Sequence, residues 1–449
     1  MRKGENDMIA KLRKQKALFM LPGILVLSLV TVGCDLDAEN PNALVEEDLG
    51  DPAVAGAMAN GALNTTSNGI GAMITPGSVL TDETTWIGSR DAWGSLDKGQ
   101  VSDVYNEFVD GQWNQITEGR WMADQAVKTL EAFQSEGTLS DTEILARAYL
   151  YAGVVRVYIA DWFEDFVYSD KTISGVPIGK GNMMTVYDEA ITILKSGLST
   201  TSDSEMKARF NAMIARAYFA KAIHAGGLNG GGFVTSGDAK TYADAALSTW
   251  DETSKYQIEY SSTTVSSDFS WQVNGRSELE FGIRPDGIGD PFPADLVDTD
   301  ASVDVADPQG NALGPADSRL AAIAHDFFKD RGGTDYAPIT AMSGAELHLI
   351  LAEIAHKGGD DDTAIEHLNK NRAGMTAYDG SNATVADAIK HERRANLFAA
   401  GRRMLDMYRF GQTSLLWETQ FEAKSAPGTL FPITIKEIRA NENVPLPSG

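Results

Sequence analysis

Apolar residues recur along much of the chain at the three- and four-residue spacing of amphipathic helices. In the first half, this spacing predicts helices over residues 112–133, 142–166, 184–198, 206–225 and 239–250. In the second half, it predicts helices over residues 343–357 and 361–372, with Gly358 and Gly359 in the turn between them. The expected fold class is therefore all-α.

The most arginine-rich stretch lies near the end of the chain, at residues 391–411. Apolar positions that include Leu397, Leu405 and Tyr408 recur there at helical spacing, which predicts one long amphipathic helix. Gly411 stands where that helix is expected to stop. Because the stretch carries five arginines in an acidic protein, it either binds an anion or ties acidic neighbours together.

Two long stretches lack a helical period, and we expect them to be irregular loop insertions. With the helical body that they interrupt, the expected segments are loops at about 64–111 and 251–316 and helices at about 112–250 and 317–411. One further helix is expected near residues 52–62. Within the second insertion, Tyr256–Tyr260 and Glu278–Ile283 alternate apolar and polar residues as short strands do.

A short internal repeat helps to define the architecture. The segment Ala-Arg-Ala-Tyr occurs at Ala146–Tyr149 and again at Ala215–Tyr218, 69 residues apart. This separation is close to two tetratricopeptide units of about 34 residues, but only one further predicted helix lies between the copies. We therefore expect tetratricopeptide-like helix pairs separated by long loops.

Composition and charge narrow the possible partners. The 449 residues include 63 Asp and Glu against 38 Lys and Arg, for a formal net charge of −25, and 43% of the residues are hydrophobic. The apolar content suffices for a packed core, and the negative charge disfavours binding to nucleic acid phosphates. Neutral or weakly charged ligands therefore remain as possible partners.

Residues 1–33 have the pattern of a lipoprotein signal peptide. A basic segment is followed by an apolar stretch, residues 17–30. This stretch is too short for a membrane span and is interrupted by Pro22. Gly33 precedes the only cysteine, Cys34, as in a bacterial lipobox, although Thr31 stands where that motif usually has leucine. A cleaved secretory signal followed by a chance cysteine is the alternative. Because one cysteine cannot form an internal disulfide, lipidation with groups such as palmitate explains Cys34 better.

Four segments resemble, in the same order, motifs of the SusD/RagB family of nutrient-binding lipoproteins. Residues 346–353 look like its E-x-x-L-I-x-A-E helix, and residues 364–374 look like its A-x-x-x-L-N-x-x-R segment. Residues 392–409 are similar to its E-R-R-x-E-L-x-x-E-G-x-R-x-x-D-x-x-R helix, and residues 430–438 resemble its L-F-P-I-P-x-x-E-I closing motif.

Two positions depart from the third motif, because Asn396 and Ala400 stand where it has acidic residues. The resemblance implies a SusD-like α/α superhelix over residues 34–449, anchored by a lipid to the outer membrane and facing the cell exterior. It also implies a partner, a SusC-like TonB-dependent transporter, and a ligand that is an oligosaccharide or sometimes a peptide. No catalytic residue and no cofactor are expected.

Aromatic residues in the two insertions are the candidate ligand-binding residues, because neutral sugars stack on aromatic rings while polar groups bind their hydroxyls. The first cluster contains Asp82, Trp86, Arg90, Asp91 and Trp93. The second contains Trp271, Asn274, Arg276, Arg284 and Asp286. In both clusters, the alternative is that the tryptophans only fill space between loop and helices. Trp113, Trp121 and Trp162 fall on predicted helices and are expected in the core.

Other charged residues receive structural or weaker assignments. Asp298, Asp300 and Asp304 form a weak Ca²⁺ candidate, since they lack the spacing of a helix-loop-helix calcium site, and no other metal site is expected. A structural role is expected for Glu346, Glu353, Arg393, Arg394, Gly401, Arg402 and Asp406. The arginines are expected to pair with these acids at exposed positions. Two other functions stay open: a surface scaffold that binds no small ligand and, less favoured, a glycoside hydrolase.

Overall fold

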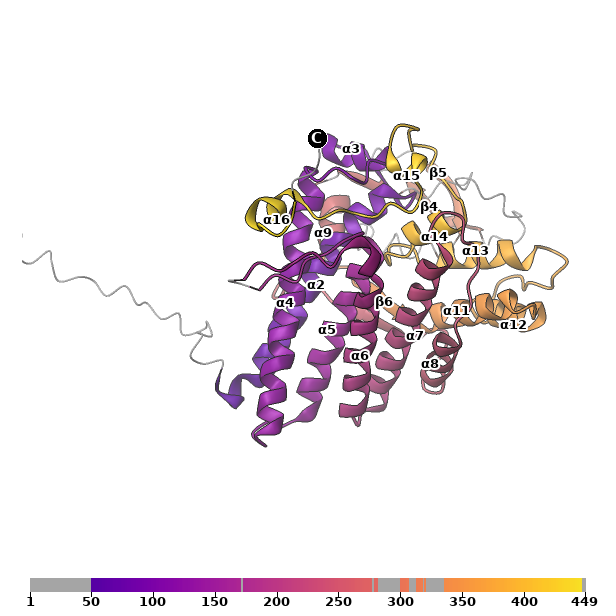
Figure 1. Ribbon diagram of the computed structural model, residues 1–449. Helices are drawn as coiled ribbons and strands as arrows, with labels where there is room; N and C mark the ends of the chain where they lie inside the picture. Colours follow the sequence, from indigo (N-terminus) through magenta and orange to yellow (C-terminus); the bar gives the residue numbers. More distant parts are fainter. Residues whose placement is uncertain are drawn as a thin grey trace, which may run out of the picture. The chain divides into compact units, whose positions relative to one another are not determined.

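The helices predicted for the first half are present in the computed structural model, which describes residues 50–170, 173–276, 278–281, 299–306, 312–317, 319 and 335–445. They are α2 (Ala55–Leu80), α4 (Glu107–Ser135), α5 (Thr142–Trp162), α6 (Met184–Thr200), α7 (Ser204–Gly226) and α8 (Gly237–Leu247). Figure 1 shows α4 to α8 side by side in chain order, each packed against the next. The all-α prediction is confirmed.

Local signals in the sequence explain where these helices begin. Asn106, Asp141 and Asp203 precede α4, α5 and α7, and each side chain accepts a hydrogen bond from a backbone N–H of the first turn. Such capping satisfies donors that have no partner inside the helix. The apolar stripe of α6 is buried as predicted, while its opposite face meets solvent.

The prediction of a first loop insertion at about 64–111 is wrong over much of that range. Helix α2 continues to Leu80, and α4 already begins at Glu107. The helical period of α2 is hidden because nearly all of its second half is buried, so polar residues do not alternate with apolar ones. Small residues also allow close packing there: a Cβ atom on Gly69 would lie 2.7 Å from the Cα of Ile116 on α4.

The second half contains a helix pair followed by shorter helices. The described elements are α11 (Gly344–Lys357), α12 (Asp361–Lys370), α13 (Val385–Asn396), α14 (Arg403–Arg409), α15 (Glu422–Ser425) and α16 (Ile435–Ala440). Asp360 caps α12 by accepting a hydrogen bond from the backbone N–H of Thr363. Phe431, in the closing motif, pairs with Phe163 just after α5, so the end of the chain packs on the helices. Among the described helices, none has the length and hydropathy to cross a membrane.

The prediction of one long helix over residues 391–411 is wrong, because α13 and α14 are separated by a turn. Ala399 and Gly401 have φ values of 53° and 78° in this turn, which is the left-handed region that helices do not use. A Cβ atom on Gly401 would lie 2.8 Å from Trp162. Gly401 is therefore needed both for its backbone conformation and for the approach of α5. Gly411, with a φ of 66°, follows the end of α14 as predicted.

Three short two-stranded antiparallel sheets complete the described fold. Strand β1 (Thr84–Trp86) pairs with β3 (Leu279–Phe281), and β2 (Lys255–Ile258) pairs with β6 (Ile339–Ser343). Strand β4 (Thr299–Ala306) pairs with β5 (Ala312–Asp317). The two predicted strands are thus confirmed as β2 and β3, and a short helix, α3 (Asp91–Asp97), follows β1.

The arginines near the end of the chain tie acidic neighbours together. Five of the pairs are Arg402 with Glu346, Arg393 with Asp406, Arg403 with Asp82, Arg409 with Glu353, and Arg409 with Asp406. The expectation that these pairs are exposed is wrong, since the side chains in them are at most 6% exposed. Arg394 also lies 3.6 Å from Asp82. Breaking such buried pairs leaves an uncompensated charge, which makes them structurally important.

Candidate ligand-binding site

The pairing of β1 with β3 brings together the two aromatic clusters that lie almost two hundred residues apart in the sequence. Trp86 on β1 lies opposite Leu279 on β3, and the backbone N–H groups of Ile87 and Gly88 donate to the carbonyl oxygen of Glu278. Glu278 in turn donates its backbone N–H to Gln272, next to Trp271. The structure therefore joins the two predicted candidate regions in one place.

The carboxylate of Glu278 holds the loop that follows β1 through hydrogen bonds. Its Oε2 accepts hydrogen bonds from the backbone N–H groups of Ser89, at 2.9 Å, and Arg90, at 3.1 Å. Its Oε1 accepts a hydrogen bond from the Ser89 hydroxyl. Partial burial alone would raise the pKa of Glu278, but these hydrogen bonds lower it and keep the carboxylate charged. A Cβ atom on Gly88 would lie 2.0 Å from Oε2, so glycine is required at this position.

Two large aromatic side chains are exposed on segments that these contacts connect. Trp271 is 44% exposed and Tyr105 is 61% exposed. Tyr105 lies two residues before Glu107, whose carboxylate forms an ion pair of 2.7 Å with Arg90. We call Trp271, Tyr105, Arg90 and Glu107 the aromatic platform. It combines aromatic surface with charged hydrogen-bonding groups, which is the composition of a sugar-binding surface.

Several predicted residues lie around the platform with different accessibilities. Asp91, in the first turn of α3, and Arg276 are exposed, while Asn274 is half-buried. Trp86 is also half-buried, and its ring covers Gly94 on α3. The sequence analysis missed Tyr105. An aromatic residue in a polar turn directly before a helix was the signal that could have identified it.

Trp93 and Asp82 are not available to a ligand, which contradicts their assignment. Trp93 is fully buried and stacks on Phe108, with ring centroids 3.6 Å apart and an interplanar angle of 9°. Asp82 is 5% exposed and binds Arg403. Burial alone would raise the pKa of Asp82, but the guanidinium groups of Arg403 and Arg394 lower it to about 2. Both residues stabilise the fold of this segment: Trp93 packs between α3 and α4, and Asp82 pairs with Arg403 of α14.

The remaining assignments concern residues that are described only partly or not at all. Cys34, Arg284, Asp286 and Asp298 lie outside the described residues. The backbones of Asp300 and Asp304 belong to β4, and the Ca²⁺ assignment remains a prediction. In the described part of the chain, no group of three His, Cys, Asp or Glu residues is arranged to hold a metal ion.

Glu83 connects the base of β1 to the turn between α13 and α14. Its Oε1 accepts a hydrogen bond of 2.9 Å from the backbone N–H of Ala399, one of the residues with positive φ. Burial raises the pKa of Glu83 from 4.5 to about 7, against the opposing effect of that hydrogen bond. The carboxyl group therefore titrates near neutral pH.

Glu83→Gln is expected to make the free energy of unfolding less dependent on pH. The Glu83 carboxyl group keeps its proton up to about pH 7 in the folded chain, and only up to about pH 4.5 in the unfolded chain. Glu83 thus stabilises the fold fully below pH 4.5, and this contribution is lost as the pH rises through 7. At pH 8 the variant should be more stable than the parent, by up to about 3 kcal/mol. Urea unfolding between pH 5 and 8 measures this, with the exposed Glu118→Gln as control; parallel curves for the parent and Glu83→Gln would contradict the assignment.

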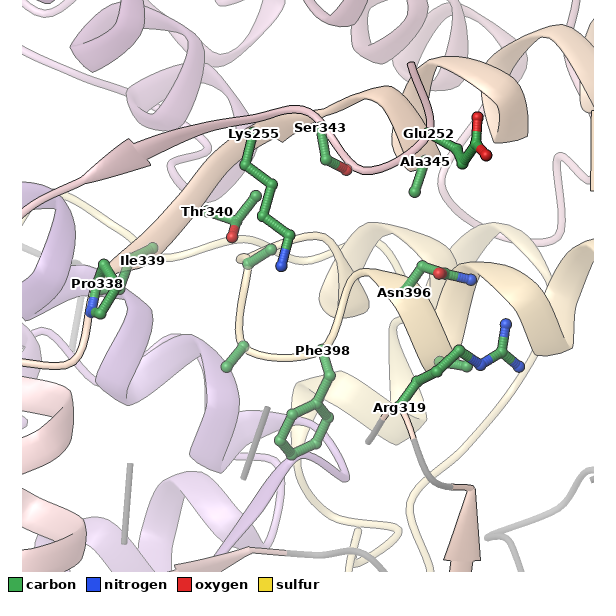
Figure 2. Close-up of a pocket in the computed structure, with 13 residues that line it drawn as sticks. Glu252, Lys255, Arg319, Pro338, Ile339, Thr340, Ser343, Ala345, Asn396 and Phe398 are labelled. Carbon is green, nitrogen blue, oxygen red and sulfur yellow. The ribbon is translucent and has the colours of Figure 1, made fainter. Parts of the chain in front are cut away.

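Two hollows accompany the described fold. The first, of about 250 Å³, lies between β6 and the turn after α13, and Figure 2 shows Lys255, Thr340, Asn396 and Phe398 around it. The second is a more open groove of about 390 Å³ on α4, where Trp121 donates its indole N–H to Asp170. Trp121 is half-buried there, so the expectation that it belongs to the core is wrong, whereas Trp113 and Trp162 are buried as predicted.

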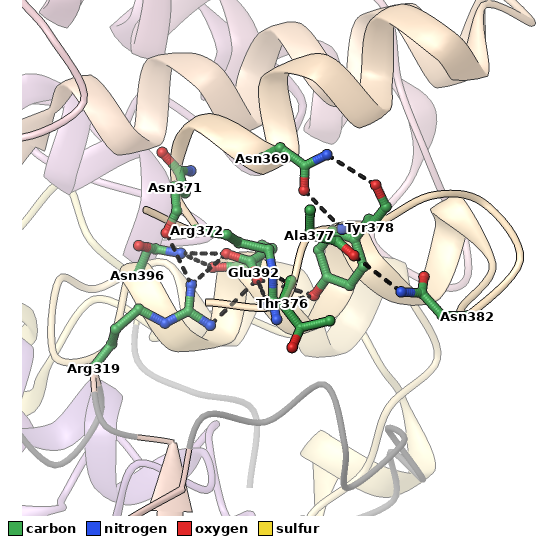
Figure 3. Close-up of polar contacts among 10 residues, drawn as sticks. All are labelled: Arg319, Asn369, Asn371, Arg372, Thr376, Ala377, Tyr378, Asn382, Glu392 and Asn396. Atoms are coloured by element: carbon green, nitrogen blue, oxygen red, sulfur yellow. Dashed lines mark hydrogen bonds and ion pairs between the residues drawn. The ribbon is translucent and has the colours of Figure 1, made fainter. Parts of the chain in front are cut away.

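A buried polar network supports the wall of the first hollow. Figure 3 shows Glu392, which is fully buried, accepting hydrogen bonds from Arg372 at 2.6 Å, Tyr378 at 3.0 Å and the Asn396 amide at 3.0 Å. Arg319 also forms an ion pair with Glu392. Because Arg372 and Glu392 belong to the second and third motifs, the motifs meet in one structural cluster.

Comparison with known proteins gives the same fold. A SusD homolog from Bacteroides thetaiotaomicron VPI-5482 is 13% identical, with a TM-score of 0.64 over 89% of this chain and 98% of that one. A SusD superfamily protein from the same organism is 14% identical, with a TM-score of 0.62 over 88% and 100% of the two chains. A SusD-like carbohydrate binding protein from Bacteroides vulgatus ATCC 8482 is 17% identical, with a TM-score of 0.52 over 81% and 84%. Among curated proteins, none matches the chain.

These similarities define the fold as that of the SusD superfamily. Residues 326–445 match the sequence model of the SusD family, and this range contains all four motifs. The match of this segment and the shared fold agree with the resemblance seen in the sequence.

Proposed function

We propose that this chain is a non-catalytic nutrient-binding lipoprotein that captures an oligosaccharide on its aromatic platform and delivers it to a SusC-like TonB-dependent transporter. The observation that carries the proposal is the exposure of Trp271 and Tyr105 beside charged groups, where the β1–β3 pairing joins the two loop regions. The match of residues 326–445 to the SusD family and the similarity to the SusD-like carbohydrate binding protein from Bacteroides vulgatus support glycan binding in general.

The proposed location follows from the first part of the sequence. Removal of residues 1–33 and lipidation of Cys34 would anchor the chain to the outer membrane, with the helical body facing the cell exterior. A binding protein anchored outside the membrane cannot move its ligand across by itself, and the SusC-like transporter would supply that route. Peptide binding and a scaffold without a small ligand are the alternatives.

Trp271→Ala is expected to weaken oligosaccharide binding by about tenfold, since it removes the indole of the platform and with it about 1.4 kcal/mol of binding free energy. Tyr105→Ala should act in the same direction. Isothermal titration of the chain without residues 1–34, using glycans found by an array that also displays peptides, measures the effect. Trp121→Ala, in the groove on α4, is the control and should leave binding unchanged.

The outcomes separate the alternatives. Unchanged binding in Trp271→Ala and Tyr105→Ala would remove the platform as the site. Binding of peptides in place of glycans would favour the peptide alternative, and absence of binding to every array member would favour the scaffold. Cleavage of a bound oligosaccharide, detected by chromatography of the products, would overturn the non-catalytic assignment.

A further inference from the structure

The hollow beside β6 contains a lysine whose charge is not neutralised by the described protein. Figure 2 shows the Lys255 side chain extending from β2 into the hollow, and Ala399 and Ala400 belong to the same lining. Within the ranges that the structure describes, Lys255 takes part in no ion pair, whereas the second cation of the lining, Arg319, pairs with Glu392. Lys255 is an exposed residue that lines the hollow, so its ammonium group can bind an anion that enters from solvent.

Neutral polar groups and one carboxylate complete the lining; Figure 2 shows that carboxylate, of Glu252, beside Ala345 and directed away from the Lys255 ammonium. The amide nitrogen of Asn396 already donates to the backbone oxygen and the carboxylate of Glu392, which leaves its oxygen as an acceptor. Figure 2 shows that oxygen and the Thr340 hydroxyl on the Lys255 side of the hollow. The hollow thus offers a cation and a hydroxyl to one part of a ligand, and an acceptor to a neighbouring N–H or O–H.

The sequence departs from the motif at this same place. Asn396 and Ala400, which stand where the third motif has acidic residues, both line the hollow. An acidic side chain at either position would lie in the same lining as Lys255 and would compete with an anionic ligand. Their replacement by an amide and a methyl group leaves both the space and the positive charge open.

We propose that this hollow, hereafter the Lys255 pocket, binds a carboxylate-bearing residue of the ligand. The carboxylate contacts the Lys255 ammonium and the Thr340 hydroxyl, and an adjacent ligand O–H or N–H donates to Asn396. A uronic acid in a glycan and the terminal residue of a peptide both have this chemistry. The volume of about 250 Å³ suits one such residue.

The Lys255 pocket adjoins the strand that leads to the aromatic platform. Ala399 lines the pocket, and its N–H donates to Glu83, the residue directly before β1. The proposal rests on the proposed function, because the platform would hold the rest of the ligand. In a protein with a net charge of −25, one local cation gives selectivity for acidic ligands that the overall charge would otherwise repel.

Isothermal titration with two pairs of probes tests this proposal. Tri-galacturonate is compared with neutral galactotriose, and hexaalanine with its C-terminal amide, at low salt. The acidic member of one pair should bind at least fivefold more tightly, and 0.3 M NaCl should reduce that preference. Lys255→Met should abolish the preference and leave the neutral probe unchanged, Lys255→Arg should keep it, and the exposed Lys128→Met on α4 should have no effect.

Each result is informative. If the preference for the acidic probe survives in Lys255→Met with an unchanged melting temperature, the Lys255 pocket is not the site. If the neutral probe binds and no acidic preference exists in the parent, this inference fails while the proposed function stands. If none of the four probes binds and the array also gives no ligand, both fail. Which pair shows the preference distinguishes a uronate from a peptide carboxylate.

Discussion

Arg409→Ala is expected to destabilise the fold by about 3–5 kcal/mol, because it leaves the carboxylates of Glu353 and Asp406 buried without their cation. Arg409 is 1% exposed; its guanidinium binds both carboxylates, with Nη2 lying 2.9 Å from Glu353 Oε2. Glu353 also accepts the backbone N–H of Val234, so its charge helps to position the segment before α8. Urea unfolding followed by circular dichroism measures the loss.

Two further variants distinguish a buried charge from a general effect of truncation. Lys240→Ala breaks an exposed pair with Asp244, whose side chains are 57% and 51% exposed, and should change stability by less than about 1 kcal/mol. Combining Arg409→Met with Glu353→Leu removes both charges and should recover part of the loss. A loss in Arg409→Ala no larger than in Lys240→Ala would contradict the structural role of the arginines.

Trp93→Ala is expected to destabilise the fold by about 3–5 kcal/mol, because it removes a fully buried indole from the contact between α3 and α4. Trp93→Phe should cost much less, since phenylalanine keeps the stacking on Phe108 and the indole nitrogen has no hydrogen-bond partner among the described residues. Differential scanning calorimetry of both variants checks the order. If Trp93→Ala instead kept its stability and lost oligosaccharide binding, Trp93 would belong to the ligand site after all.

The helices of the body were predictable because one face of each is buried and the other is exposed. Helices α4 to α8 and α11 to α12 have this property, and their capping residues mark their starts. Helix α2 was not predictable in its second half, since burial on nearly all sides removes the period on which the prediction depends. The break between α13 and α14 was hidden for another reason: Gly401 fits the apolar stripe of a helix, and neither its positive φ nor its close approach to Trp162 is visible in the sequence.

The candidate site was predictable in composition and not in geometry. Sequence reasoning selected Trp271 and Trp86 by residue type, but burial distinguishes an exposed indole from Trp93, which has the same type in the same loop. The joining of the two loops depends on Glu278, whose partners are 188 and 189 residues away in the sequence. Arg402 and Arg393 pair with two of the expected acids, Glu346 and Asp406. Arg403 and Arg394 instead pair with Asp82, and Glu353 pairs with Arg409, because these contacts depend on how distant segments pack.

The central claim, that an oligosaccharide binds on the aromatic platform, is tested most directly by amide hydrogen exchange with and without a glycan that binds. The platform predicts slower exchange in residues 84–90, 104–107 and 271–281 when the glycan is present, with no change on the outer face of α6 to α8. Protection confined to the groove around Trp121, or to any other described segment, with no change at the platform would contradict the claim.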